Sequence, residues 1–288
     1  MSFDAFIETA WNDHADRPQE VADRLVASLD LVRAPEQIGP LARLATHVYG
    51  EHLGQWQRGI AMLESLRGLP AFDGSPAAAT QVVRGIATLR YAQGDRSVLD
   101  ALPADERVCV LAAAAAVFAG RDDFGASIAA FGDALRGTPV DIATNSPAIR
   151  ALAVGGNNLA VALEGKADRD SAETSAMVTA AEAGARYWKQ AGTWLEEERA
   201  HYRLACSLLA AGQAPAARQS AERCVAVCAA NDAPAFERFF ADAALALACR
   251  ASGDAEAFAA VRQSALAWHE QVPEADKTSC RPDLDKLG

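Results

Sequence analysis

The sequence is poor in basic charge. Its 27 Lys and Arg residues stand against 38 Asp and Glu residues, which gives a formal net charge of −11 over 288 residues. Nucleic-acid binding depends on Lys and Arg side chains that neutralise phosphate groups, so this balance argues against a nucleic-acid partner. No block of basic residues suggests attachment to an anionic membrane surface either.

Long apolar stretches are also missing. The longest runs from Val108 to Gly120 (VCVLAAAAAVFAG), well short of the roughly 20 residues that a membrane-spanning helix needs. We expect it to form a central helix that is buried on several sides. The first residues, MSFDAFIETAW, show neither the basic nor the apolar region of a signal peptide, so we expect a cytoplasmic protein.

Cysteine is too sparse for a disulfide scaffold. Six cysteines are spread over a long chain, whereas disulfide-stabilised proteins are short and cysteine-dense, so reduced thiols are expected. Cys224 and Cys228 lie four residues apart on one predicted helix face, and Cys206 lies on the preceding helix. A thiol metal or redox site at these three residues is one alternative. Packing as small buried hydrophobes is the simpler interpretation.

Catalytic signatures are absent as well. The sequence contains no phosphate-binding glycine loop, nucleophile elbow or kinase signature, and therefore predicts no enzyme and no cofactor. The segment HVYGEH superficially resembles a zinc-protease signature, but that signature needs two histidines four residues apart. His47 and His52 are five apart, about 140° around an α-helix, so we expect them to diverge and predict no metal site.

What the sequence does contain is a helix–turn–helix pattern, clearest from Glu198 to Ala230. Apolar residues recur at helical spacing from Tyr202 to Leu209, and Gly212 can end that helix in the left-handed conformation. The second helix carries a stripe of small and apolar residues: Ala217, Ala221, Cys224, Val225 and Cys228. Small residues on both helices would let the two backbones approach closely.

Weaker copies of this pattern recur along the chain. A small residue lies seven positions before several turn glycines, as Ala246 does before Gly253 and Ala87 before Gly94. The turn glycines are Gly54, Gly94, Gly120, Gly165, Gly212 and Gly253. No alternating run of strand length occurs. We therefore predict an all-α, right-handed solenoid of about seven antiparallel helix pairs.

In this interpretation residues 1–272 form the helical array. The turn-rich interval 137–146 is a candidate joint within it. Residues 273–288 are a polar, proline-broken tail, either frayed or laid across the last pair.

The pattern resembles the tetratricopeptide repeat (TPR), in which a turn glycine is followed by an aromatic residue and then by small and aliphatic positions. Around Gly54 the sequence reads Trp56-x-x-Gly59-Ile60-x-x-Leu63. The segment Asn157-Asn158-Leu159-Ala160-Val161 is similar to the start of the long repeats of kinesin light chains. Glycine spacing averages roughly 40 residues rather than 34, as in the long-helix arrays of kinesin light chains and of some bacterial transcription regulators.

The resemblance implies that the first helix of each pair lines a concave wall. By its register, the exposed positions of that wall are Asn157, Asn158, Arg203, Tyr202, Arg199, Arg84, Arg107 and Arg43. In TPR arrays that bind peptides, such residues hold the peptide backbone and carboxylates. The chemistry is suitable because Asn offers both a donor and an acceptor, and Arg can bind a carboxylate through two parallel bonds.

The leading hypothesis is a non-enzymatic binding or scaffold module, an adaptor that holds a protein or peptide segment in the concave groove. The arginines suit a partner that is acidic or carries a free carboxylate. Homodimer formation stays open. Two alternatives remain: a ligand-sensing regulatory module that controls a transcription factor or enzyme, and a thiol metal or redox protein using Cys206, Cys224 and Cys228.

Overall fold

A computed structural model describes residues 1–139 and 141–288 of the chain, and all regular secondary structure in these residues is helical. The chain divides into two compact units, Met1–Ile142 and Ala143–Gly288. The division falls within the interval 137–146, of which Val140 lies outside the described residues. None of the described helices is long and apolar enough to cross a membrane.

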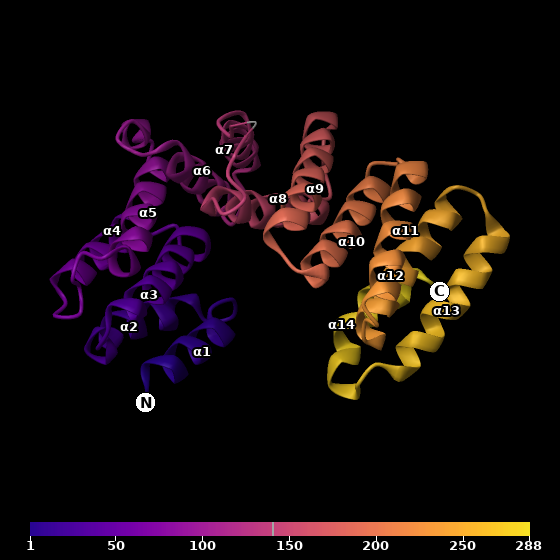
Figure 1. Ribbon diagram of the computed structural model, residues 1–288, viewed down its shortest axis with the longest axis horizontal. Helices are drawn as coiled ribbons and strands as arrows, with labels where there is room; N and C mark the ends of the chain where they lie inside the picture. Colours follow the sequence, from indigo (N-terminus) through magenta and orange to yellow (C-terminus); the bar gives the residue numbers. More distant parts are fainter. Residues whose placement is uncertain (140) are drawn as a thin grey trace. The chain divides into compact units, whose positions relative to one another are not determined.

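The first unit consists of seven α-helices and several short helical turns (Figure 1). The helices are α1 (Phe3–Asp13), α2 (Pro18–Ala27), α3 (Pro35–His47), α4 (Trp56–Ser65), α5 (Pro76–Ala92), α6 (Ala104–Ala119) and α7 (Phe124–Arg136). One apolar core runs through α1 to α5, with Leu25, Leu41, Leu63 and Leu89 fully buried. The predicted central helix is α6, which buries eight of its residues.

Two local features of this unit shape its first hairpins. Helix α3 begins at Pro35, because proline at the first helical position lacks only an N–H that has no partner there. The hairpin predicted around Gly94 has no second α-helix. A 3₁₀-helix, Arg96–Leu99, takes its place after α5.

A π-helix, Val48–His52, follows α3 directly. Its wide turn is closed by the bond from the Leu53 amide to the Val48 carbonyl, 3.1 Å, which spans five residues instead of four. The Trp56 indole donates to the Gly50 carbonyl at 3.3 Å. Gly54 then reverses the chain with φ of +61°, as the sequence predicts for a turn glycine.

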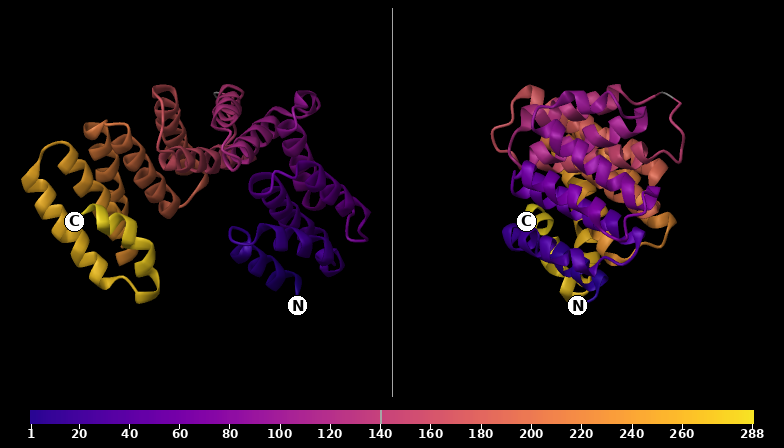
Figure 2. Two further views of the ribbon diagram at one scale, coloured as in Figure 1. Left: turned by 180° about the vertical axis from the view of Figure 1, so that it is seen from behind. Right: turned by 90° about the vertical axis from the view of Figure 1, so that its left-hand side faces the viewer.

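The second unit is more regular. Its helices are α8 (Pro147–Gly165), α9 (Ser171–Ala191), α10 (Trp194–Ala210), α11 (Ala214–Ala230), α12 (Ala235–Ala251), α13 (Ala255–Gln271) and α14 (Lys277–Lys286). Helices α8 to α13 form three consecutive hairpins, which Figure 2 shows from two further directions. The predicted small residues lie at the helix contacts, since Ala205, Ala217, Ala246 and Ala265 are fully buried.

The segment predicted as a polar tail forms a helix. Helix α14 packs against α12 and α13, the two helices of the last hairpin. Cys280 and Leu287 are fully buried in the same core as Phe239 of α12. Regularly placed apolar residues are few here, so the helix depends on tertiary contacts more than on its own pattern.

Candidate functional site

The predicted binding residues of the first unit are Arg43, Arg84 and Arg107. Arg84 has a partner within the chain: its Nε and Nη2 atoms donate to Glu106 at 3.0 and 2.8 Å, and its side chain is 16% exposed. Arg107 is exposed. Arg43 is exposed as a residue, yet partial burial of its guanidinium, with the nearby charge of Arg84, lowers the pKa of Arg43.

In the second unit, the three predicted residues of α10 have partners within the chain. Arg199 forms a two-bond ion pair with Glu237, and Arg203 pairs with Glu164. The Tyr202 ring packs edge-on against Phe240, with 5.4 Å between the centroids, and burial raises the pKa of Tyr202. These side chains join helices of the repeat to one another.

The two predicted asparagines face different surroundings. Asn158 is exposed. The Oδ1 atom of Asn157 is buried and lies against Gly184 of α9, where an added Cβ would come within 2.2 Å of it. That amide oxygen therefore lies in the α8–α9 contact, and Asn158 is the member of the pair that remains open.

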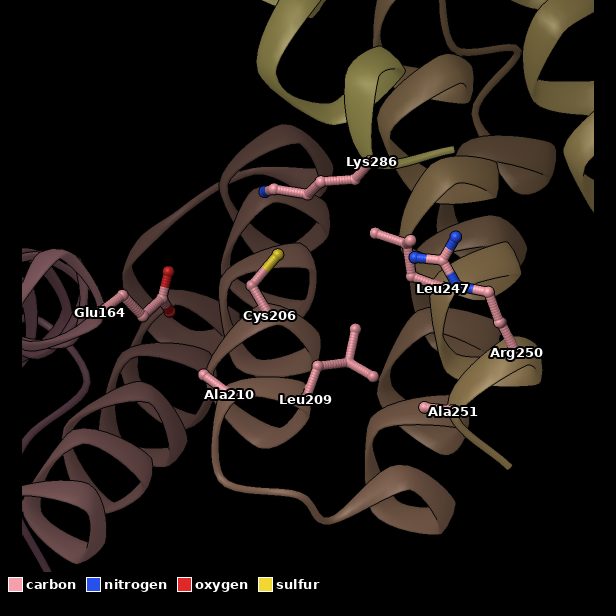
Figure 3. A pocket seen from close by; sticks show the side chains of 8 residues that line it. All are labelled: Glu164, Cys206, Leu209, Ala210, Leu247, Arg250, Ala251 and Lys286. Carbon is pink, nitrogen blue, oxygen red and sulfur yellow. The ribbon is translucent and has the colours of Figure 1, made fainter. Parts of the chain in front are cut away.

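A pocket of 410 Å³ lies between helices of the second unit (Figure 3). Helix α8 contributes Glu164 to the lining, and α14 contributes Lys286. The remaining lining residues come from α10 and α12: Cys206, Leu209, Ala210, Leu247, Arg250 and Ala251. Helices α8, α10 and α12 are the first helices of three successive hairpins, the helices predicted to carry the binding surface.

The charged side chains around this pocket differ in their partners and in their exposure. Arg203 neutralises Glu164, whose Oε1 atom also accepts a bond from Ser207 at 2.5 Å. Arg250 is exposed, with its guanidinium carbon 5.2 Å from the centre of the Phe258 ring. Lys286 is 56% exposed and 3.3 Å from Asp283. The pocket lining thus contains two cationic side chains, one carboxylate that is paired with Arg203, and mostly apolar residues between them.

Neither cation was predicted from the sequence. Lys286 belongs to the segment expected to be a tail, and only the packing of α14 brings it to α12. Arg250 lies three residues before Gly253, a position that the helical pattern alone does not mark as a site. The pocket does lie on α8, α10 and α12, the first helices of successive hairpins, which the sequence predicts to line the concave wall.

Of the three cysteines in the thiol hypothesis, Cys224 and Cys228 are buried and Cys206 is half-buried. Burial raises the pKa of Cys206 to about 11 and that of Cys228 to about 12. The Cys224 Sγ atom lies 2.9 Å from Oε1 of Glu198. A thiolate is the form that binds metals and attacks disulfides, so these thiols are poorly suited to either role at neutral pH.

The histidines correct the sequence prediction. His47 and His52 do not diverge: their Nε2 atoms are 3.1 Å apart. The expected 140° separation holds for an α-helix, but the π-helix Val48–His52 widens the turn and aligns residues five apart. His14, the residue after α1, joins them, so that one ligand nitrogen from each ring lies within 4.8 Å of the others.

No family model matches the chain, and no curated protein matches it. Its structure is similar to the crystal structure of a protein from Podosopora anserina described as a kinesin light chain with nearly identical TPR-like repeats, which has 17% sequence identity and a TM-score of 0.50. That match covers 82% of this chain and 97% of the other. A single-residue variant of the same protein gives 16% identity, a TM-score of 0.50, and coverage of 83% and 97%.

The fold is TPR-like. The likeness confirms the helical-repeat architecture predicted from the turn glycines and the small residues before them. At this level of identity it concerns the fold alone.

Proposed function

We propose that this TPR-like protein is a non-enzymatic interaction scaffold that binds a peptide or protein segment on the surface of α8, α10 and α12. The observation that carries the proposal is the pocket. It lies on the first helices of three successive hairpins, and the side chains of Arg250 and Lys286 give its lining two positive charges. Helical-repeat proteins commonly present such a continuous surface to a partner.

The pocket chemistry suits a peptide that ends in, or carries, a carboxylate next to an apolar side chain. Leu209 and Leu247 offer apolar contacts on opposite sides of the pocket (Figure 3). Arg250 can donate two parallel hydrogen bonds to a carboxylate, and Lys286 adds a second charge. Asn158, exposed on α8, is available to bind the peptide backbone.

The test is a binding measurement with two forms of one peptide. Peptides selected from a labelled library are synthesised with a free C-terminal carboxylate and with a C-terminal amide. We expect Arg250→Ala to weaken binding of the carboxylate form by about 10-fold or more, since a charged hydrogen bond contributes roughly 1.5–3 kcal/mol.

The matched control is Arg281→Ala. Arg281 lies on α14, is 73% exposed and is not part of the pocket lining. Equal losses in both variants, or unchanged binding in Arg250→Ala, would contradict the assignment of the pocket.

A ligand-sensing regulatory module is the second candidate, and the size of the pocket favours it. Its 410 Å³ falls within the roughly 300–1,000 Å³ typical of small-molecule sites. A thermal-shift screen separates the two functions, because a specific small ligand raises Tm by mass action in the absence of any peptide. A cytoplasmic location and the formation of a homodimer remain proposals that rest on the sequence alone.

A further inference from the structure

Three of the five histidines of the chain meet at one place in the first unit. His14 follows α1, His47 ends α3, and His52 ends the π-helix. The ring centroids lie 4.7 to 5.0 Å apart for every pair of the three. All three residues are half-buried, so the site is shielded yet reachable from solvent.

We propose that His14, His47 and His52 bind a divalent transition-metal ion, with Zn²⁺ as the best fit. Zinc binds imidazole nitrogen at 2.0–2.1 Å in tetrahedral geometry, which places neighbouring ligand nitrogens about 3.3 Å apart. The Nε2 atoms of His47 and His52 are 3.1 Å apart, close to this separation. The His14 ligand atom lies within 4.8 Å of both.

Neighbouring acceptors prepare two of the rings for this role. The Nδ1 atom of His47 lies 2.8 Å from Glu51, and Nδ1 of His14 lies against the Trp11 carbonyl oxygen. Each oxygen can only accept, so each Nδ1 carries the proton and each Nε2 carries the lone pair. A metal-bound histidine typically donates its second N–H to a carboxylate or a carbonyl in this way.

The close approach of His47 and His52 requires a proton or a cation between them. With the His47 Nε2 lone pair directed at His52, the contact is favourable when His52 donates a proton from Nε2. A metal ion replaces that hydrogen bond when the neutral His52 shifts its proton to Nδ1. No oxidation and no net loss of a proton are involved.

The π-helix brings His52 next to His47 and so positions two of the three ligands. Gly50, in its centre, packs so tightly that an added Cβ would lie 2.9 Å from Val117 and 3.0 Å from Leu89. These contacts hold the wide turn against α5 and α6, so the alignment of His47 with His52 is fixed by the fold before any ion binds.

The donor set of three imidazoles suits Zn²⁺, Co²⁺, Ni²⁺ or Cu²⁺ and not Mg²⁺ or Ca²⁺, which prefer oxygen ligands. Three protein ligands leave a fourth position for water or for a partner's side chain.

The experiment is a titration of the metal-stripped, untagged full chain with Zn²⁺ and Co²⁺. We expect one equivalent of Co²⁺ to bind with the visible absorption of a tetrahedral site, and Zn²⁺ to displace it. His14→Gln, His47→Gln and His52→Gln should each weaken binding by at least about 100-fold, because each removes one of three ligands.

The control variants are His201→Gln and His269→Gln, which remove the two histidines outside the cluster and should bind as the wild type does. Glu51→Gln should weaken binding by about 10-fold, the effect expected of an outer partner of a metal ligand. Circular dichroism of each variant shows whether it keeps its helices. Binding below one-tenth of an equivalent, or binding equally reduced by His201→Gln, would overturn the proposal, and neither outcome bears on peptide binding by the second unit.

Discussion

Glu198 is a carboxylic acid that the fold buries almost completely, at 1% exposure. Burial raises its pKa to about 8, and the neighbouring Glu237 carboxylate adds to this rise. Because Glu237 is neutralised by Arg199, Glu198 is the member of the pair that holds a proton at neutral pH. Its Oε2 atom has no hydrogen-bond partner among the described residues, so the neutral form is the one that this site tolerates.

A raised carboxyl pKa has a definite consequence for stability. Below the ordinary pKa of 4.5, both the folded and the unfolded states are protonated at this residue. Between that value and about 8, only the unfolded state loses the proton, so stability falls as pH rises through this window. Glu198→Gln should therefore raise Tm at pH 8 by at least about 2 °C and have a smaller effect at pH 5.

Thermal unfolding at the two pH values measures this difference. Glu182→Gln, an exposed position on α9, is the control and should show no pH-dependent change. A lower Tm for Glu198→Gln at pH 8 would mean that the ionised carboxylate stabilises the fold, contrary to the account.

Arg84 tests whether a predicted binding residue serves the fold instead. Its two hydrogen bonds to Glu106 join α5 to α6 in a largely shielded position. Arg84→Ala should lower the free energy of unfolding by about 1–2 kcal/mol and leave peptide affinity unchanged. Denaturant titration measures the first effect, with exposed Arg67→Ala as the control. A change in peptide affinity without a loss of stability would restore Arg84 as a binding residue.

At the residue scale, the sequence indicates which side chains could bind a carboxylate, but it does not indicate which glutamates those side chains contact within the fold. Arg84 meets a glutamate 22 positions away, and Arg203 meets one 39 positions away. Such pairs depend on how successive hairpins stack, which no local pattern encodes. The small residues were predictable because their spacing from a turn glycine is local.

At the scale of the helical element, Gly156 of α8 and Gly184 of α9 mark a close approach of these two helices. A Cβ on Gly156 would lie 2.5 Å from the Ala180 carbonyl oxygen, a backbone atom that cannot rotate away. Gly156→Ala should therefore lower Tm by about 3–10 °C through overpacking.

The matched control is Gly165→Ala at the end of the same helix, where an added Cβ meets nothing within 4 Å. Scanning calorimetry of both variants makes the comparison. If the two variants melted together, the close approach of α8 and α9 would be refuted.

The elements themselves were predictable to different degrees. Hairpins with a small residue before a turn glycine, such as α10 with α11, follow directly from the sequence. The π-helix does not, because its wide turn depends on contacts of Gly50 with Val117 and Leu89, from helices distant in the chain. Because of the π-helix, His47 and His52 lie side by side instead of diverging, and the histidine cluster forms. Helix α14 was missed as a helix because its apolar contacts are tertiary.

At the scale of the whole molecule, the chain is two compact helical units, and we propose that 137–146 acts as the joint between them. Arg136, the last residue of α7, has a 72% exposed side chain and directly precedes this interval. Limited trypsin digestion should therefore cleave first after Arg136 and give two fragments that keep their helical content. Mass spectrometry identifies the first cut. A first cut within a helix of either unit, with 136 intact, would argue against a joint here.

Hydrogen–deuterium exchange with a bound carboxylate peptide measures directly whether the surface of α8, α10 and α12 binds a peptide. We expect the peptide to slow exchange at residues 203–210 and 247–251, which include the α10 and α12 residues of the pocket lining, and to leave exchange in α9, α11 and α13 unchanged. Slower exchange confined to α9, α11 and α13, or to the first unit, would contradict peptide binding at this surface.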